Sequence, residues 1–139
     1  MKPTMPRPTD SSLPDTAELR RHLPELQRAI AGELLQDETS RVLHATDASV
    51  YRQLPLAVAR PRNAADLRAL IAFARRHGAS LIPRTAGTSL AGQVVGGGIV
   101  VDVGFHLNRI LAIDVSNRRV RVEPGVVRDE LNLALRPHG

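Results

Sequence analysis

The segment RTAGTSLAG, residues 84–92, combines residue types that suit a loop binding an anion. Gly87 and Gly92 have no side chain to keep a ligand from the backbone, and successive backbone N–H groups in a turn form a concave anion site. The hydroxyl donors in the segment are Thr85, Thr88 and Ser89. The pattern therefore predicts a site for phosphate or pyrophosphate. The alternative is a surface turn whose small residues serve only the geometry of the chain.

Three known motifs share part of this pattern and fail on particular residues. Gly87 and Gly92 have the spacing of a P-loop, but Gln93 stands where that motif requires lysine. Ser89 lies two residues after Gly87, as in the nucleophile elbow of serine hydrolases, but Ala91 replaces the final glycine and no strand runs directly into the serine. The sequence also contains no G-x-G-x-x-G. A nucleoside triphosphatase, a serine hydrolase and a Rossmann nicotinamide site are therefore all disfavoured.

The segments before the loop predict a strand, a helix and a second strand. The apolar run LAVA, residues 56–59, precedes a helical pattern that Asn63 can cap and Gly78 can end in the left-handed conformation. The apolar residues on one predicted face of this helix are Leu67, Leu70, Ile71 and Ala74. Residues 79–83 then predict a short buried strand. This order favours a parallel crossover, which places the next loop at the carboxyl edge of an α/β sheet, where ligands tend to bind.

The chain before this unit predicts a helical region and a connector. Residues 15–35 predict one amphipathic helix, or a pair broken near Pro24. The apolar residues at helical spacing are Leu19, Leu23, Leu26, Ile30 and Leu34. Residues 36–61 are interrupted by polar residues and prolines and predict a connecting segment that ends in the LAVA strand. Residues 1–14 hold four prolines and predict a flexible lead-in.

The chain after the loop predicts three strands and a helix. The strands are expected at residues 96–103, 110–115 and 119–123, the last two joined by the hairpin turn SNRR. The final segment predicts a helix with Val127, Leu131 and Leu135 on one face. A single domain over residues 15–139 follows, because a chain of 139 residues with 42% hydrophobic residues supports one core of ordinary size.

Composition narrows the possible partners. The net charge of +5 comes from 18 arginines and the single Lys2, and it permits a phosphate-bearing ligand. The charges are scattered, and only Tyr51, Phe73 and Phe105 offer aromatic rings for stacking bases, so nucleic acid is not the expected partner. Without cysteine the sequence has no disulfide, thiolate metal site or cysteine nucleophile. It also has no apolar run of transmembrane length and no secretory signal, so we expect a cytoplasmic protein without a transmembrane segment.

The remaining polar residues predict structural roles. The five histidines are far apart with no pair at metal-ligand spacing, so we expect them on the surface or at caps and expect no metal site. Asp102 lies inside an apolar strand and predicts a buried hydrogen-bonding role. Arg84 is expected either to offset phosphate charge or to be solvated.

Several stretches resemble a known family. PRTAGTSLAGQVVGGGIVVDV, followed by LNRIL and by IDVSNRRVRVEPGVVRDELN, resembles the amino-terminal half of the FAD-binding domain in FAD-linked oxidases of the vanillyl-alcohol oxidase and p-cresol methylhydroxylase type. TDASVYRQLPLAVARP resembles the branch that contains glycolate, D-lactate and D-2-hydroxyglutarate dehydrogenases. The resemblance runs from about Asp37 to Gly139. It implies an α/β (α+β) fold in which a small mixed sheet is flanked by helices.

The resemblance also implies a cofactor site. The residues that would wrap the FAD pyrophosphate are Arg84, Thr85, Ala86, Gly87, Thr88 and Ser89 in a first turn, and Leu90, Ala91, Gly92 and Gln93 in a second. Pro124 and Gly125 match a strand end that lies against the flavin. Many members have two glycines at Thr85 and Ala86, and Ala86 would resist a positive φ. Thr88 matches the histidine that holds flavin covalently in some relatives, so non-covalent FAD is implied.

The implied parent protein passes hydride from a 2-hydroxy acid to FAD and then reduces an electron acceptor. Family members continue with the rest of the FAD-binding domain and a cap domain that carries much of the catalytic machinery. We therefore expect the 139 residues alone to bind FAD weakly or not at all, to show no turnover and to self-associate. The alternative functions are a stand-alone nucleotide- or pyrophosphate-binding module without redox turnover and a basic nucleic-acid-binding domain.

Overall fold

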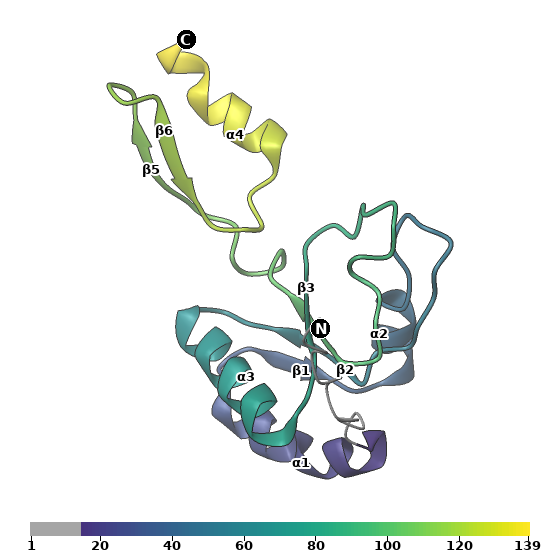
Figure 1. Ribbon diagram of the computed structural model, residues 1–139. Helices are drawn as coiled ribbons and strands as arrows, with labels where there is room; N and C mark the ends of the chain where they lie inside the picture. The colour runs from purple at the N-terminus through teal and green to yellow at the C-terminus, as the bar shows by residue number, and fades with distance from the viewer. Residues whose placement is uncertain (1–14) are drawn as a thin grey trace, which may run out of the picture.

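The computed structural model describes residues 15–139, in two parts that Figure 1 shows one above the other. The flexible lead-in expected at residues 1–14 lies outside the described residues. The elements are α1 (Thr16–Ala29), β1 (Glu33–Leu35), α2 (Glu38–Leu43), β2 (Ala57–Arg60), α3 (Ala64–His77), β3 (Leu81–Arg84), β4 (Ile99–Asp102), β5 (Ile110–Asp114), β6 (Arg119–Val122), α4 (Arg128–Leu135) and the short 3₁₀ helix η1 (Arg136–His138). None of the helices within residues 15–139 combines the length and the apolar character needed to cross a bilayer.

A four-stranded mixed sheet forms the larger part, in the order β1-β2-β4-β3. β2 and β3 both run parallel to β4, whereas β1 is antiparallel to β2. The predicted parallel crossover is therefore confirmed in direction, but β4 inserts between its two strands. Because β3 and β4 are parallel neighbours, the chain must return from one end of the sheet to the other, and it does so through residues 85–98 without a helix. The predicted binding loop is the first part of this connection.

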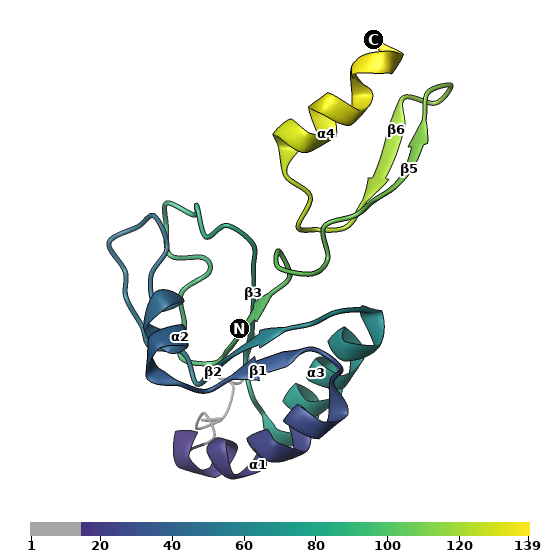
Figure 2. The ribbon, with the colours of Figure 1, turned by 180° about the vertical axis from the view of Figure 1, so that it is seen from behind.

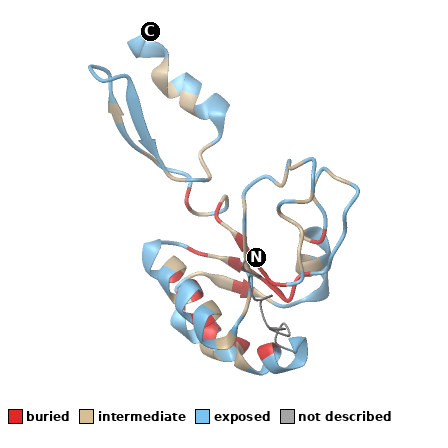
Figure 3. Ribbon diagram, viewed as in Figure 1, coloured by how far each residue is buried: buried red, intermediate tan, exposed pale blue. Residues whose placement is uncertain are grey.

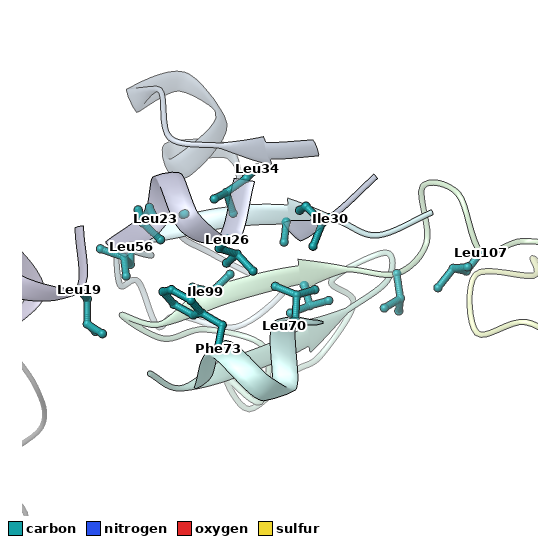
Figure 4. Close-up of a cluster of buried hydrophobic side chains, with 14 residues drawn as sticks. Leu19, Leu23, Leu26, Ile30, Leu34, Leu56, Leu70, Phe73, Ile99 and Leu107 are labelled. Carbon is teal, nitrogen blue, oxygen red and sulfur yellow. The ribbon is translucent and has the colours of Figure 1, made fainter. Parts of the chain in front are cut away.

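Helices α1 and α3 lie side by side against one face of the sheet, as both views show (Figures 1 and 2). Leu23 and Leu26 of α1 meet Leu70 and Phe73 of α3 over Ile99 of β4 in the buried core (Figure 4). α1 runs through Pro24 without a break, so of the two predicted alternatives the single helix is observed, although it ends at Ala29. Leu34 belongs to β1 and not to the helix.

Helix α3 begins and ends as predicted. The Asn63 side chain accepts hydrogen bonds from the N–H groups of Ala65 and Asp66, and Gly78 ends the helix with φ 68°. The predicted apolar face is shifted, however, because Ile71 is 52% exposed while Phe73 is buried. Phe73 lies outside the predicted face, and contact with α1 decides which side chains of α3 are covered.

The smaller part consists of the β5–β6 hairpin and α4, and it has little buried surface of its own (Figure 3). The hairpin and its turn are confirmed, with Arg118 at φ 52° in the turn. α4 is also confirmed, but none of its residues is buried, and Val127 lies at its N-cap with 54% of its surface exposed. The sequence analysis missed α2, a helix of six residues capped by Asp37, because so short a helix has no clear periodicity.

Candidate functional site

The loop after β3 reverses direction at two glycines. Gly87 has φ 69° and Gly92 has φ 74°, both in the left-handed region that favours glycine. Among the non-glycine residues of 15–139, only Arg118 has a positive φ, so the backbone of Ala86 is not strained. Ala86 therefore does not need a positive φ, because the chain reverses one residue later, at Gly87.

The first turn of the loop presents backbone donors without protein partners. Within residues 15–139, the N–H groups of residues 86–90 make no hydrogen bond to a protein acceptor. They are adjacent in the chain and lie around the left-handed Gly87. Successive amides of this kind form the concave donor sets that bind phosphate oxygens. Backbone hydrogen bonding thus leaves this segment available to an anionic ligand.

The second turn, by contrast, is closed by its own side chains. Ser89 Oγ accepts from the N–H of Gln93 at 3.1 Å, and its hydroxyl donates to Gln93 Oε1. Gln93 Oε1 also accepts from the N–H of Ala91 at 3.3 Å. Leu90 is 81% exposed, and the Gly92 backbone packs so close to Tyr51 that an added Cβ would lie 2.7 Å from the ring. The N–H groups of Ala91 and Gln93 are therefore occupied within the second turn and are not available to a ligand.

The Arg84 side chain connects the loop to the segment that follows α2. Its Nη1 donates to the carbonyl oxygens of Thr46 at 2.7 Å and His44 at 3.3 Å, and the guanidinium lies against Gly87. The sequence analysis expected this side chain to offset phosphate charge or to be solvated. In the structure it is a half-buried brace between the loop and the segment after α2.

We predict that Arg84→Ala loosens this loop. The variant loses two hydrogen bonds from a charged donor, so the free energy of unfolding should fall by about 1–2 kcal/mol. Proteolysis within residues 85–98 should also become faster, because the brace no longer holds the first turn. The matched control is Arg119→Ala on the exposed strand β6. Equal proteolysis rates in the two variants would show that Arg84 does not hold the loop.

An open cavity of about 690 Å³ lies between the first turn and the segment that leads into α4. Thr85, Ala86 and Thr88 line it on one side, and Pro124 and Gly125 on the other. The structure therefore brings together the predicted first turn and the predicted strand end, although they are far apart in sequence. Leu90, Ala91, Gly92 and Gln93 do not line this cavity.

Two glycines make the floor of this cavity close-packed. The N–H of Gly125 donates to the carbonyl oxygen of Leu107 at 2.8 Å, and a Cβ on Gly125 would lie 2.7 Å from the Cα of Gly104. Gly104 in turn approaches the backbone of Thr85. Gly104 was not among the residues predicted from the sequence, although its place directly after the β4 strand and Val103 was a signal for it. The crossing of two backbone segments at this point needs residues without side chains.

A network of charged groups supports the cavity from the sheet side. Asp102 Oδ1 accepts from the N–H of Gly104 at 3.2 Å, and its Oδ2 lies 3.5 Å from Arg60 Nε. Arg60 also pairs with Glu33, and Glu33 contacts His106 Nε2 at 3.2 Å. The contact with His106, assisted by Arg60, holds the pKa of Glu33 below its usual value. The buried hydrogen-bonding role predicted for Asp102 is present, since its side chain is only 13% exposed.

Comparison with known proteins gives three findings. Residues 55–139 match the family described as FAD binding domain. D-2-hydroxyglutarate dehydrogenase of Pseudomonas putida is 43% identical over 111 residues, which cover 78% of this chain and 11% of that protein. Glycolate oxidase subunit GlcD of Bacillus subtilis is 32% identical over 102 residues, which cover 71% of this chain and 22% of that protein. The chain thus spans about a tenth of the length of the curated dehydrogenase it matches.

A solved structure of p-cresol methylhydroxylase with substrate bound is similar in fold. It superposes with a TM-score of 0.76 at 14% identity, covering 88% of this chain and 25% of that protein. At this identity the likeness concerns the fold alone. It confirms the mixed α/β arrangement of a small sheet and flanking helices that the family resemblance implied.

Proposed function

Since this chain belongs to the FAD binding domain family of FAD-linked oxidoreductases, we propose that the loop of residues 84–93 binds the pyrophosphate of FAD, with the backbone N–H groups of residues 86–90 as donors. The observation that carries the proposal is the row of unpartnered N–H groups at residues 86–90, at the carboxyl end of β3. Pro124 and Gly125 form the opposite wall of the same cavity.

The residues present fit this cofactor. Gly87 and Gly125 both lie where a side chain would collide with neighbouring groups of the protein, so glycine allows the close packing of the two segments beside the cavity. The charged side chains that line the cavity are Arg128 and two carboxylates, those of Asp102 and Asp129. Carboxylates repel a pyrophosphate, so the anionic part of FAD is expected at the loop and not beside these two residues.

We propose that the parent protein oxidises a 2-hydroxy acid and passes the electrons to a separate acceptor. The names of the D-2-hydroxyglutarate dehydrogenase and glycolate oxidase relatives support this substrate class. When bound, FAD supplies the hydride acceptor, and the contribution of this chain is to hold and orient it. Within the parent protein, residues 15–139 would form the amino-terminal part of the FAD-binding domain, and by themselves would bind FAD weakly without turnover.

Titration of the chain with FAD, ADP and inorganic pyrophosphate tests the binding proposal. We expect FAD to bind more tightly than ADP, because the wall at Pro124 and Gly125 adds contacts to the part of FAD that ADP lacks. Isothermal calorimetry or fluorescence quenching of the flavin measures the difference. Equal affinities for FAD and ADP would support the alternative of a general nucleotide- or pyrophosphate-binding module.

We predict that the flavin is released completely by acid precipitation of the flavin-loaded protein. Thr88 lines the cavity at the position that matches the flavin-linking histidine of some relatives, and a hydroxyl cannot form that link. After centrifugation, flavin absorbance should be found in the supernatant and not in the pellet. Yellow colour that stays with the precipitated protein would show a covalent bond and overturn the assignment.

A further inference from the structure

Two histidines and a glutamate meet on the helix layer, outside the loop cavity. His22 and Glu25 lie one turn apart on α1, and His77 is the last residue of α3. One ligand atom from each of the three lies within 4.8 Å of the others. No spacing in the sequence indicates this histidine pair, because His22 and His77 come together only through the packing of α1 on α3.

The geometry of the three side chains leaves a nitrogen without a partner. The His22 and His77 rings stack with centroids 4.2 Å apart, and Phe73 supports the His77 ring at 4.6 Å. His77 Nε2 is buried and has no hydrogen-bond partner among the described residues. Its 3.4 Å approach to Glu25 Oε2 does not have hydrogen-bond geometry. This buried ring nitrogen is an unsatisfied polar atom, and a hydrogen-bond partner or a metal ion would satisfy it.

We propose that His22, Glu25 and His77 bind a divalent transition-metal ion, best satisfied by Zn²⁺, which clamps α1 to α3. Two imidazoles and one carboxylate are a donor set that Zn²⁺ uses, with water in the fourth position. Bond lengths of about 2.0–2.1 Å place tetrahedral ligand atoms roughly 3.4 Å apart. The present separations of up to 4.8 Å must therefore shorten by rotation of the half-buried side chains, and the stacked rings must tilt so that their nitrogen lone pairs converge on the ion. Mg²⁺ and Ca²⁺ prefer oxygen ligands and suit this set poorly.

Arg76 competes with the ion for the carboxylate. Its Nη1 contacts Glu25 Oε1, so a bound cation must share or displace the guanidinium. Removing Arg76 is therefore expected to change the affinity for Zn²⁺ in the opposite direction from removing one of the three ligands. Arg76→Gln removes the competing cation and is expected to tighten Zn²⁺ binding by about two- to fivefold, the range of an exposed ion pair.

Competition of the full chain with a chromophoric zinc chelator tests this site. We expect one equivalent of Zn²⁺, an affinity at least about tenfold weaker in His22→Gln and His77→Gln, and no change in the control His138→Ala at the far end of the chain. Zn²⁺ should also raise the melting temperature of the unmodified chain and not that of His22→Gln. Co²⁺ gives a second readout, since its visible bands report ligation by ring nitrogen.

The histidine variants test the site only if they remain folded. His77→Gln removes a ring that packs on Phe73, so circular dichroism without metal checks its fold. His22→Gln keeps the proposal testable if His77→Gln does not fold. Affinity and stoichiometry that are the same in His22→Gln and the unmodified chain would overturn the proposed site, as would weaker binding in Arg76→Gln.

Discussion

Gly87→Val is expected to lower the affinity for FAD by about five- to a hundredfold. Gly87 has φ 69°, and holding a non-glycine residue in the left-handed region costs about 1–3 kcal/mol. The free loop can relax to avoid this strain, so the cost is felt when FAD requires the native turn. The added side chain would also meet the Arg84 guanidinium and displace it from Thr46. FAD titration of both proteins measures the change.

A substitution in the same loop provides the control. Leu90 is 81% exposed, has an ordinary φ and does not line the cavity, so Leu90→Ala should leave FAD affinity unchanged. Circular dichroism should show both variants folded, because the loop lies outside the buried core. Unaltered FAD affinity in Gly87→Val would remove the first turn from the proposed site.

Asp66→Ala is expected to destabilise the fold by about 3–5 kcal/mol. The Asp66 side chain is 2% exposed, and its carboxylate accepts from the N–H groups of Ala31, Gly32 and Arg62 at 2.9, 3.0 and 2.8 Å. These bonds tie the start of α3 to the turn between α1 and β1. Alanine leaves three backbone donors without an acceptor, and each buried unsatisfied group costs about 1–3 kcal/mol, partly offset where water can enter. Urea denaturation measures the loss.

The neighbouring cap is the matched comparison for Asp66. Asn63→Ala removes two capping bonds at an exposed position of the same helix and should cost only about 1 kcal/mol. Both residues lie at the start of α3. The difference between the two losses in free energy of unfolding therefore reports what the buried hydrogen bonds contribute beyond ordinary helix capping. A loss in Asp66→Ala no larger than that in Asn63→Ala would show that the three bonds do not hold the two segments together.

Local signals in the sequence predicted the elements that local physics determines. Asn63 and Gly78 bound α3 because capping and a left-handed C-cap need only neighbouring residues. Strand order did not follow in the same way: β4 lies between β2 and β3 because of pairing between distant segments. The position of Ile71 outside the core has the same cause, since α1 decides which part of α3 is covered.

In the candidate site, too, residues indicated by local sequence were predictable and residues that depend on tertiary contacts were not. The glycines and hydroxyl residues of the first turn indicated an anion-binding loop by themselves, whereas Gly125 was indicated only by the family resemblance. The brace at Arg84 and the close approach of Gly104 were not predictable, since each depends on a partner brought near by the fold. The His22–His77 pair was missed for the same reason, as no spacing in the sequence predicts a contact between two helices.

The most direct test of the central claim is a ¹H–¹⁵N NMR titration of the chain with FAD, which reports each backbone amide even when binding is weak. We predict that the largest shift changes fall on the amides of residues 85–90, where the N–H groups of residues 86–90 have no protein acceptor, and on Gly125, which lines the cavity together with Thr85 and Thr88. Amides of the β5–β6 hairpin should change little. Shift changes that leave residues 85–90 unaffected while FAD binds would contradict the assignment of this loop to the cofactor.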